Sequence, residues 1–83
     1  MDFEEFYPIS QAEYESIMIE KLRGISQFEV NPVQRNQLTN LKKIMDVGGV
    51  DERIYYRGYV DVWDVWDSNG QLYLRHRVLD STD

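Results

Sequence analysis

The sequence contains no cysteine, and His76 is its only histidine. The lack of cysteine excludes disulfide bonds, thiolate zinc sites and cysteine nucleophiles together, so packing alone has to stabilise the fold. No apolar run approaches the roughly 20 residues that span a bilayer, and the N-terminal residues lack the basic and apolar regions of a secretory signal. We therefore expect a cytoplasmic protein that makes no membrane contact.

Residue patterns for catalysis and for cofactor binding are also scarce. A hydrolase of the histidine type needs a base beside a nucleophile, but the expected strand alternation places Asp61 and His76 on opposite faces. The stretch ending in "DSNG" resembles a calcium loop, yet its first ligand position would be Val65. The chain has no P-loop and no GxGxxG. These gaps predict a protein that is not an enzyme and that binds neither a metal nor a cofactor.

The 83 residues allow one domain, residues 1–83, with a net charge of -6. This charge is unevenly spread, because residues 1–30 carry -5, residues 31–45 carry +3 and residues 46–83 carry -4. An acidic surface repels phosphate backbones and attracts cationic surfaces. We therefore expect a basic partner.

A first helix is predicted over residues 11–23. Ser10 and Glu13 have the spacing of a capping box, and Gly24 can supply the residue that ends the helix. The apolar residues of this segment cover an arc of about 200°, which is wider than a one-sided surface helix needs. The helix is therefore expected either to lie centrally or to offer Ile19 and its neighbours to a partner.

A second helix is predicted over residues 32–46. Asn31 is a suitable N-cap, Pro32 falls at the first helical position, and Gly48 with Gly49 ends the segment. Apolar residues of this stretch fall on one face at helical spacing.

From residue 52 the pattern alternates, which predicts a hairpin with strands over residues 52–66 and 71–79. A three-residue loop, 68–70, sorts apolar and polar side chains between the two faces better than the two-residue loop Asn69-Gly70 does, although it leaves Asp64 on the apolar face. We therefore expect the three-residue loop.

The expected fold class is α+β, with two helices packed on one face of the C-terminal antiparallel hairpin in the order ααββ. A third strand is expected either from residues 26–30 or from the N-terminal "DFEEFYPI".

The chosen register gives the hairpin a second face that is aromatic and charged. Tyrosine, tryptophan and arginine are the residue types most enriched in binding hot spots. The predicted contact residues on this face are Tyr59, Asp61, Trp63, Tyr73, Arg75 and Arg77, and Glu13 and Glu20 on the first helix form a second, acidic patch.

These features predict a small acidic module that binds a larger basic protein as an inhibitor, immunity factor or regulatory subunit, and a nucleic-acid-processing protein is one such target. One alternative is single-stranded nucleic acid stacked on the aromatic and arginine face. Another is a homodimer without a catalytic role, in which a second copy covers this face. The N-terminal "FEEFY" is a further candidate to cover it.

Overall fold

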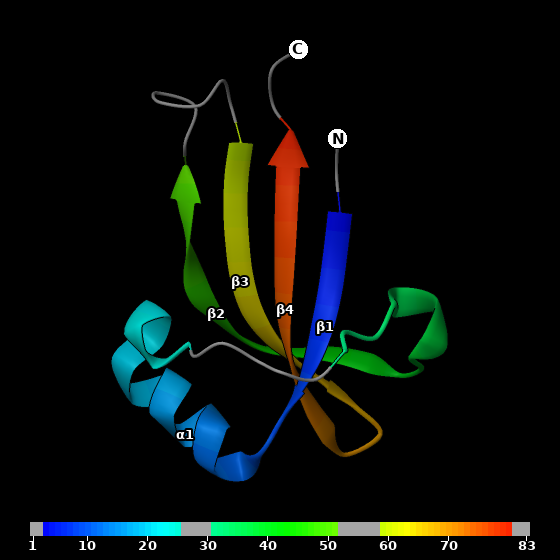
Figure 1. Cartoon of the computed structure of the whole chain (residues 1–83). Coiled ribbons are helices and arrows are strands. Elements are labelled where there is room, and N and C mark those ends of the chain that lie inside the picture. Colours follow the sequence, from blue (N-terminus) through cyan, green and yellow to red (C-terminus); the bar gives the residue numbers. More distant parts are fainter. Residues whose placement is uncertain (1–2, 26–30, 52–58, 81–83) are drawn as a thin grey trace.

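A computed structural model describes residues 3–25, 31–51 and 59–80 of the chain. In these residues it shows a four-stranded antiparallel sheet and one α-helix (Figure 1). The strands lie in the order β1-β4-β3-β2. The elements along the chain are β1 (Phe3–Ile9), α1 (Gln11–Glu20), the 3-10 turns η1 (Lys21–Gly24) and η2 (Arg35–Gln37), β2 (Leu41–Asp51), β3 (Tyr59–Ser68) and β4 (Gln71–Asp80).

The predicted order of two helices followed by a hairpin is wrong, because residues 41–46 of the expected second helix belong to strand β2. Asn40 adopts a left-handed backbone conformation that no α-helix continues through. Thr39 and Asn40 instead bond to the β3–β4 turn: the Thr39 carbonyl accepts from the Ser68 hydroxyl at 2.7 Å, and the Asn40 amide donates to Asn69 at 2.7 Å. Bonds to the distant β3–β4 turn and pairing with β3 thus overrule the helical spacing of the apolar residues.

The first helix begins at Gln11 as predicted, with both bonds of the Ser10–Glu13 capping box in place. It ends at Glu20, three residues before the expected end, because Lys21 leaves the helical conformation with φ 57° and ψ -129°. The following turn, η1, folds back closely on the helix. A Cβ on Gly24 would come within 2.6 Å of the Ser16 carbonyl oxygen, so only glycine fits there.

The predicted third strand exists at the N-terminus, where β1 pairs with β4. The other segment considered for it, residues 26–30, lies outside the described residues. Strand β3 ends at Ser68, two residues after its predicted end, and β4 begins at Gln71 as predicted. Residues 52–58, the predicted first part of the hairpin, lie outside the described residues.

The hairpin register differs from the predicted one. Ser68 pairs with Gln71, so the loop is the two-residue Asn69-Gly70 that the sorting of side chains had disfavoured. Both loop residues have positive φ, at 51° and 92°, as a type I′ turn requires. The predicted register is wrong because it requires one apolar face and one solvated face, whereas parts of both faces of the sheet are buried.

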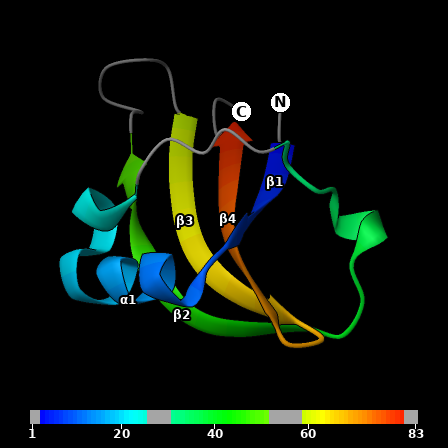
Figure 2. The same cartoon turned by 60° about the horizontal axis from the view of Figure 1, so that its bottom comes forward.

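One face of the sheet packs against α1, and its buried core consists of Ile9, Ile17, Val47, Val65 and Leu74. Phe6, which is fully buried, lies on the opposite face. Figures 1 and 2 show α1 beside the β2 edge and η2 beyond the β1 edge.

The two edges of the sheet are blunted in different ways. Beside β1, Phe6 and Val33 exchange two backbone hydrogen bonds of 3.1 and 2.8 Å. Along β2, the register shifts twice, and Lys42 and Lys43 are exposed. Bulges and lysines are common protections of an edge strand against pairing with another chain.

The conformation of Lys21 gives a stability prediction. Glycine adopts its φ and ψ without a steric penalty, so Lys21→Gly should raise the free energy of unfolding by about 0.5 to 1 kcal/mol in urea titrations. The matched control is Glu20→Gly, one residue earlier in a helical conformation, which should lower it by about 1 kcal/mol. A loss of stability in Lys21→Gly would show that the backbone of Lys21 is not strained.

Candidate functional site

The six residues predicted to share one face of the hairpin lie on two faces. In the observed register Trp63 is opposite His76 and Asp64 is opposite Arg75, and directly opposed residues point to the same side. Asp61 and Trp63 therefore lie on the face that α1 covers, whereas Tyr73, Arg75 and Arg77 lie on the other. Tyr59 opens β3, and its side chain is outside the described part of the structure.

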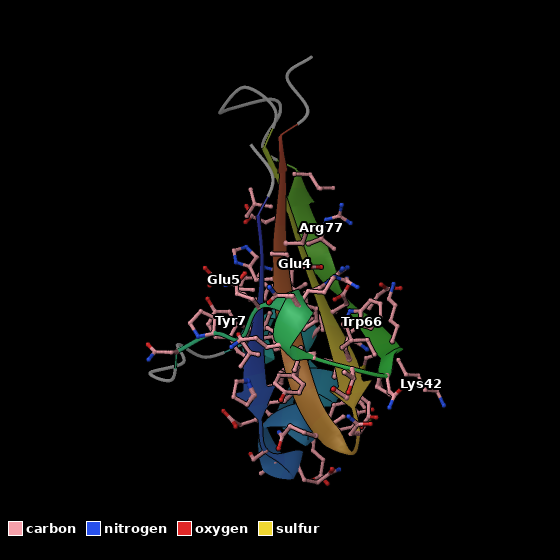
Figure 3. The ribbon with its side chains drawn as sticks, turned by 90° about the vertical axis from the view of Figure 1, so that its right-hand side faces the viewer. Glu4, Glu5, Tyr7, Lys42, Trp66 and Arg77 are labelled. Carbon is pink, nitrogen blue, oxygen red and sulfur yellow. The ribbon has the colours of Figure 1, made fainter. Side chains whose placement is uncertain are left out.

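Side chains drawn in Figure 3 show the same division. Glu5 and Tyr7 stand on one side of the sheet, and Glu4, Trp66 and Arg77 stand on the other. The predicted aromatic and arginine platform is thus not formed as one surface.

On the helix-covered face, Trp63 and His76 stack with their ring centroids 3.9 Å apart and their planes 3° from parallel. The His76 Nε2 atom lies 2.6 Å from the Asp61 carboxylate. This contact corrects the expectation that Asp61 and His76 point to opposite faces. A histidine paired with an aspartate is only part of a catalytic arrangement, so the absence of enzymatic activity remains a prediction.

Tyr7 on the same face donates a short hydrogen bond from its hydroxyl group to the Glu5 carboxylate. Burial and this bond together raise the pKa of Tyr7 to about 12. The hydroxyl therefore stays protonated throughout the physiological pH range.

The opposite face is organised by a network of five residues, Glu4, Arg35, Asp64, Trp66 and Arg75, which we name the arginine network. Arg75 is 8% exposed and donates two bonds, of 2.8 and 2.6 Å, to the Asp64 carboxylate, which is 1% exposed. Arg75 also donates to Glu4 at 2.8 Å, and Arg35 holds the same Glu4 with two bonds of 2.8 and 2.9 Å. The network thus connects three strands and η2.

Trp66 lies inside the network. Its indole N–H donates to the Asp64 carboxylate at 2.6 Å, and the guanidinium groups of Arg75 and Arg35 lie 5.0 and 5.7 Å from its ring centroid. These contacts combine cation–π attraction with hydrogen bonding. Among the described residues, every buried side-chain nitrogen and oxygen has a hydrogen-bond partner.

The charges of the network stabilise one another. The hydrogen bond from Arg35, opposed by burial and reinforced by Arg75, lowers the pKa of Glu4 to about 2. Burial disfavours the charged form of Arg75, but its bonds to Asp64 and Glu4 outweigh this effect and raise its pKa. Arg75 is therefore occupied by the carboxylates of its own chain and acts as part of the fold.

Sequence reasoning missed Glu4, Arg35 and Trp66 as members of this site. The one available signal was Asp64, which fell on the apolar face in the predicted register. A two-residue loop would have placed Asp64 directly opposite Arg75 as an ion pair.

The two residues of the predicted acidic patch on the first helix differ in their surroundings. Glu13 closes the capping box, since its carboxylate accepts from the Ser10 backbone N–H at 2.8 Å. Glu20 is exposed at the end of α1. The Glu13 carboxylate therefore helps to start the helix, whereas the Glu20 carboxylate does not.

An exposed apolar surface lies at the end of α1 and in η1, and we name it the helix patch. It consists of Met18, Ile19 and Leu22, which are 44%, 77% and 38% exposed. Leu22 rests against Gly48 of β2, so the patch adjoins the edge of the sheet. Exposed charged residues surround it, namely Glu15, Glu20, Lys21 and Arg23.

No helix in the described part of the chain is both long and apolar enough to cross a membrane. No group of three or more histidine, aspartate or glutamate side chains in that same part could hold a metal ion.

The arginine network makes stability depend on pH. The pKa of Glu4 is lowered in the fold, so its contribution is fully present above pH 4.5 and is lost as the pH falls toward 2. Glu4→Gln should cost about 1 to 2 kcal/mol at pH 7 after solvent screening, and this difference from the wild type should vanish near pH 2 in urea titrations. The exposed Glu15→Gln serves as the control, with a change below about 0.5 kcal/mol. A difference that persists unchanged at pH 2 would contradict the assignment.

A double substitution tests whether the buried pair serves the fold. Asp64→Leu alone leaves the buried Arg75 with Glu4 as its remaining carboxylate and removes the acceptor of the Trp66 N–H, so it should cost about 3 kcal/mol in the free energy of unfolding. Asp64→Leu combined with Arg75→Met should recover part of this loss, because the two apolar side chains fill a volume similar to that of the ion pair and no buried charge remains between them, while the Trp66 N–H still lacks its acceptor. The variant Arg75→Met is also measured alone. If the loss of stability in the double variant equals the sum of the losses in Asp64→Leu and Arg75→Met, the two side chains do not depend on each other.

Comparisons with known proteins give no relative from which a function could be transferred: no family model matches the chain, and neither a curated protein nor a solved structure matches it.

Proposed function

We propose that this protein is a small acidic protein-binding module, that it acts as an inhibitor, immunity factor or regulatory subunit of a larger basic protein, and that it contacts its partner through the helix patch. The observation that carries the proposal is the 77% exposure of Ile19, with Met18 and Leu22 beside it. Contiguous exposed apolar residues with a polar rim are typical of protein interaction sites.

Ile19, the most exposed residue of the helix patch, is not needed to cover the sheet, whereas Leu22 rests against Gly48 of β2. Ile17 is fully buried against the core and Tyr14 packs beside it, so α1 already presents one apolar side to the sheet. Ile19 follows two residues later, about 200° around the helix, and points away from that side. This fits the second alternative of the sequence prediction, in which Ile19 is offered to a partner.

The edges of the sheet support partner binding less well. A partner strand that extended the sheet would have to displace the Val33 bridge from β1, or pair along β2 across two register shifts and past two lysines. Strand addition needs a regular row of free backbone groups. A docking site on the helix is therefore favoured over a docking site on an edge.

The charge of the chain favours a basic partner. A net charge of -6 attracts a cationic surface over a distance of about a Debye length, which raises the association rate and makes it sensitive to salt. We expect the complex to form in the cytoplasm, which remains a prediction.

The nucleic-acid alternative has less support than the protein partner. Its stacking platform required Trp63 and Arg75 to share a face, and the observed register separates them. Arg75 is already bound by two carboxylates. A homodimer remains an alternative that the experiments below distinguish.

Site-specific cross-linking tests the proposed contact. A photo-reactive amino acid replaces Ile19 in the cells that produce the protein, and the control position is Asn36, which is exposed in η2. We expect a defined basic protein to be cross-linked at position 19 and not at position 36. The same protein should bind Ile19→Asp at least about tenfold more weakly, because the change places a charge in an apolar contact. Cross-links only to the chain's own copies, or equal yields at both positions, would contradict the proposal.

A further inference from the structure

We infer that the partner presents an amphipathic helix to α1, with a basic residue beside Glu15, apolar residues over the helix patch and an acidic residue beside Lys21 and Arg23. This inference rests on the proposed function, because it specifies the partner element that the same surface accepts.

The shape of the surface favours a helix as the partner element. The helix patch begins in the last turn of α1, whose ten residues form a rod of about 15 Å, and continues into η1. Side-chain ridges on such a rod pack into the grooves of another helix. Met18 adds an unbranched, adaptable side chain at the contact.

Charges of opposite sign lie at the two ends of the patch. Glu15 is one helical turn before both Met18 and Ile19, so it adjoins them at the N-terminal end. Its contact with the Gln11 amide is long, at 3.3 Å. At the C-terminal end Lys21 and Arg23 are exposed together with Glu20, so this end carries one more positive than negative charge.

The side chains of these four charged residues, Glu15, Glu20, Lys21 and Arg23, have no ion-pair partner within residues 3–25, 31–51 and 59–80. A complementary segment therefore carries a base at one end and an acid at the other.

Lys21 gives separate support for the basic end. Its backbone has φ 57° and ψ -129°, a region that glycine occupies without strain. A lysine at this position keeps a positive charge beside Leu22 at a cost in stability. Such a trade between stability and function is common at binding sites.

A second copy of the chain fits this surface less well than a basic partner. Two copies each carry a net charge of -6 and repel each other. A contact between two rods of this length buries less than the roughly 800 Å² per partner of a stable interface. Attraction to a basic partner compensates for a small contact area, whereas repulsion between copies does not.

A displayed library of 18-residue amphipathic helices tests the inference. The library has a fixed leucine stripe and flanking positions that vary among arginine, glutamate and glutamine, and it is selected on the full chain and counter-selected on Ile19→Asp. We expect the enriched helices to carry arginine at one end and glutamate at the other. They should bind Ile19→Asp about tenfold more weakly, and Glu15→Gln and Lys21→Gly about threefold more weakly. Asn36→Asp is the control and should bind unchanged.

Lys21→Gly separates binding from folding, because it should weaken helix binding while making the chain more stable. Enriched helices with arginine at both ends would overturn the charge order and leave the proposed function standing. Helices that bind Ile19→Asp as well as the wild type would overturn the helical partner. Light scattering across a dilution series completes the test: a dimer that Ile19→Asp abolishes would identify a second copy as the occupant and would overturn the inference.

Discussion

The buried contact of Arg75 with Asp64 and Glu4 is the constraint on which the rest of the structure depends. A guanidinium group that is 8% exposed is tolerated only when carboxylates neutralise it and accept its hydrogen bonds. Asp64 can do so only in the register of a two-residue turn, and Glu4 only if the N-terminal strand pairs with β4. The same interaction therefore fixes the hairpin register and the place of β1.

The network also explains why the sheet is covered on parts of both faces. Arg35 binds Glu4 and lies over Phe6 and Trp66, which holds η2 close to the sheet. On the other face α1 covers the aliphatic core. With Arg75 and Trp66 committed to the network, the large side chains of β4 and β3 that invited a binding interpretation are mostly explained by folding. Among the described residues, the exposed large apolar side chains that folding leaves unexplained are those of the helix patch and Ile44 of β2.

A binding surface on α1 is consistent with how stability is distributed. The helix is anchored at its start by the capping box and further along by Ile17, whereas its last turn carries the exposed apolar residues Met18 and Ile19 and is followed by the strained Lys21. Features that cost stability and are not needed for the core gather at this end. Such a distribution is typical of a fold that maintains a contact surface.

The sequence by itself determined the local features: the start of α1 from its capping box, the presence of a turn within residues 68–70, the strand ends beside that turn, and the acidic charge. It did not determine β2, the register or the site, because each of these depends on a partner distant in the sequence. The apolar spacing of residues 32–46 fits a helix when it is considered alone, and pairing with β3 decides otherwise. Glu4 and Arg75 are 71 residues apart, and only the tertiary structure brings them together. Burial in that structure also removes competing water, which strengthens the electrostatic attraction between them.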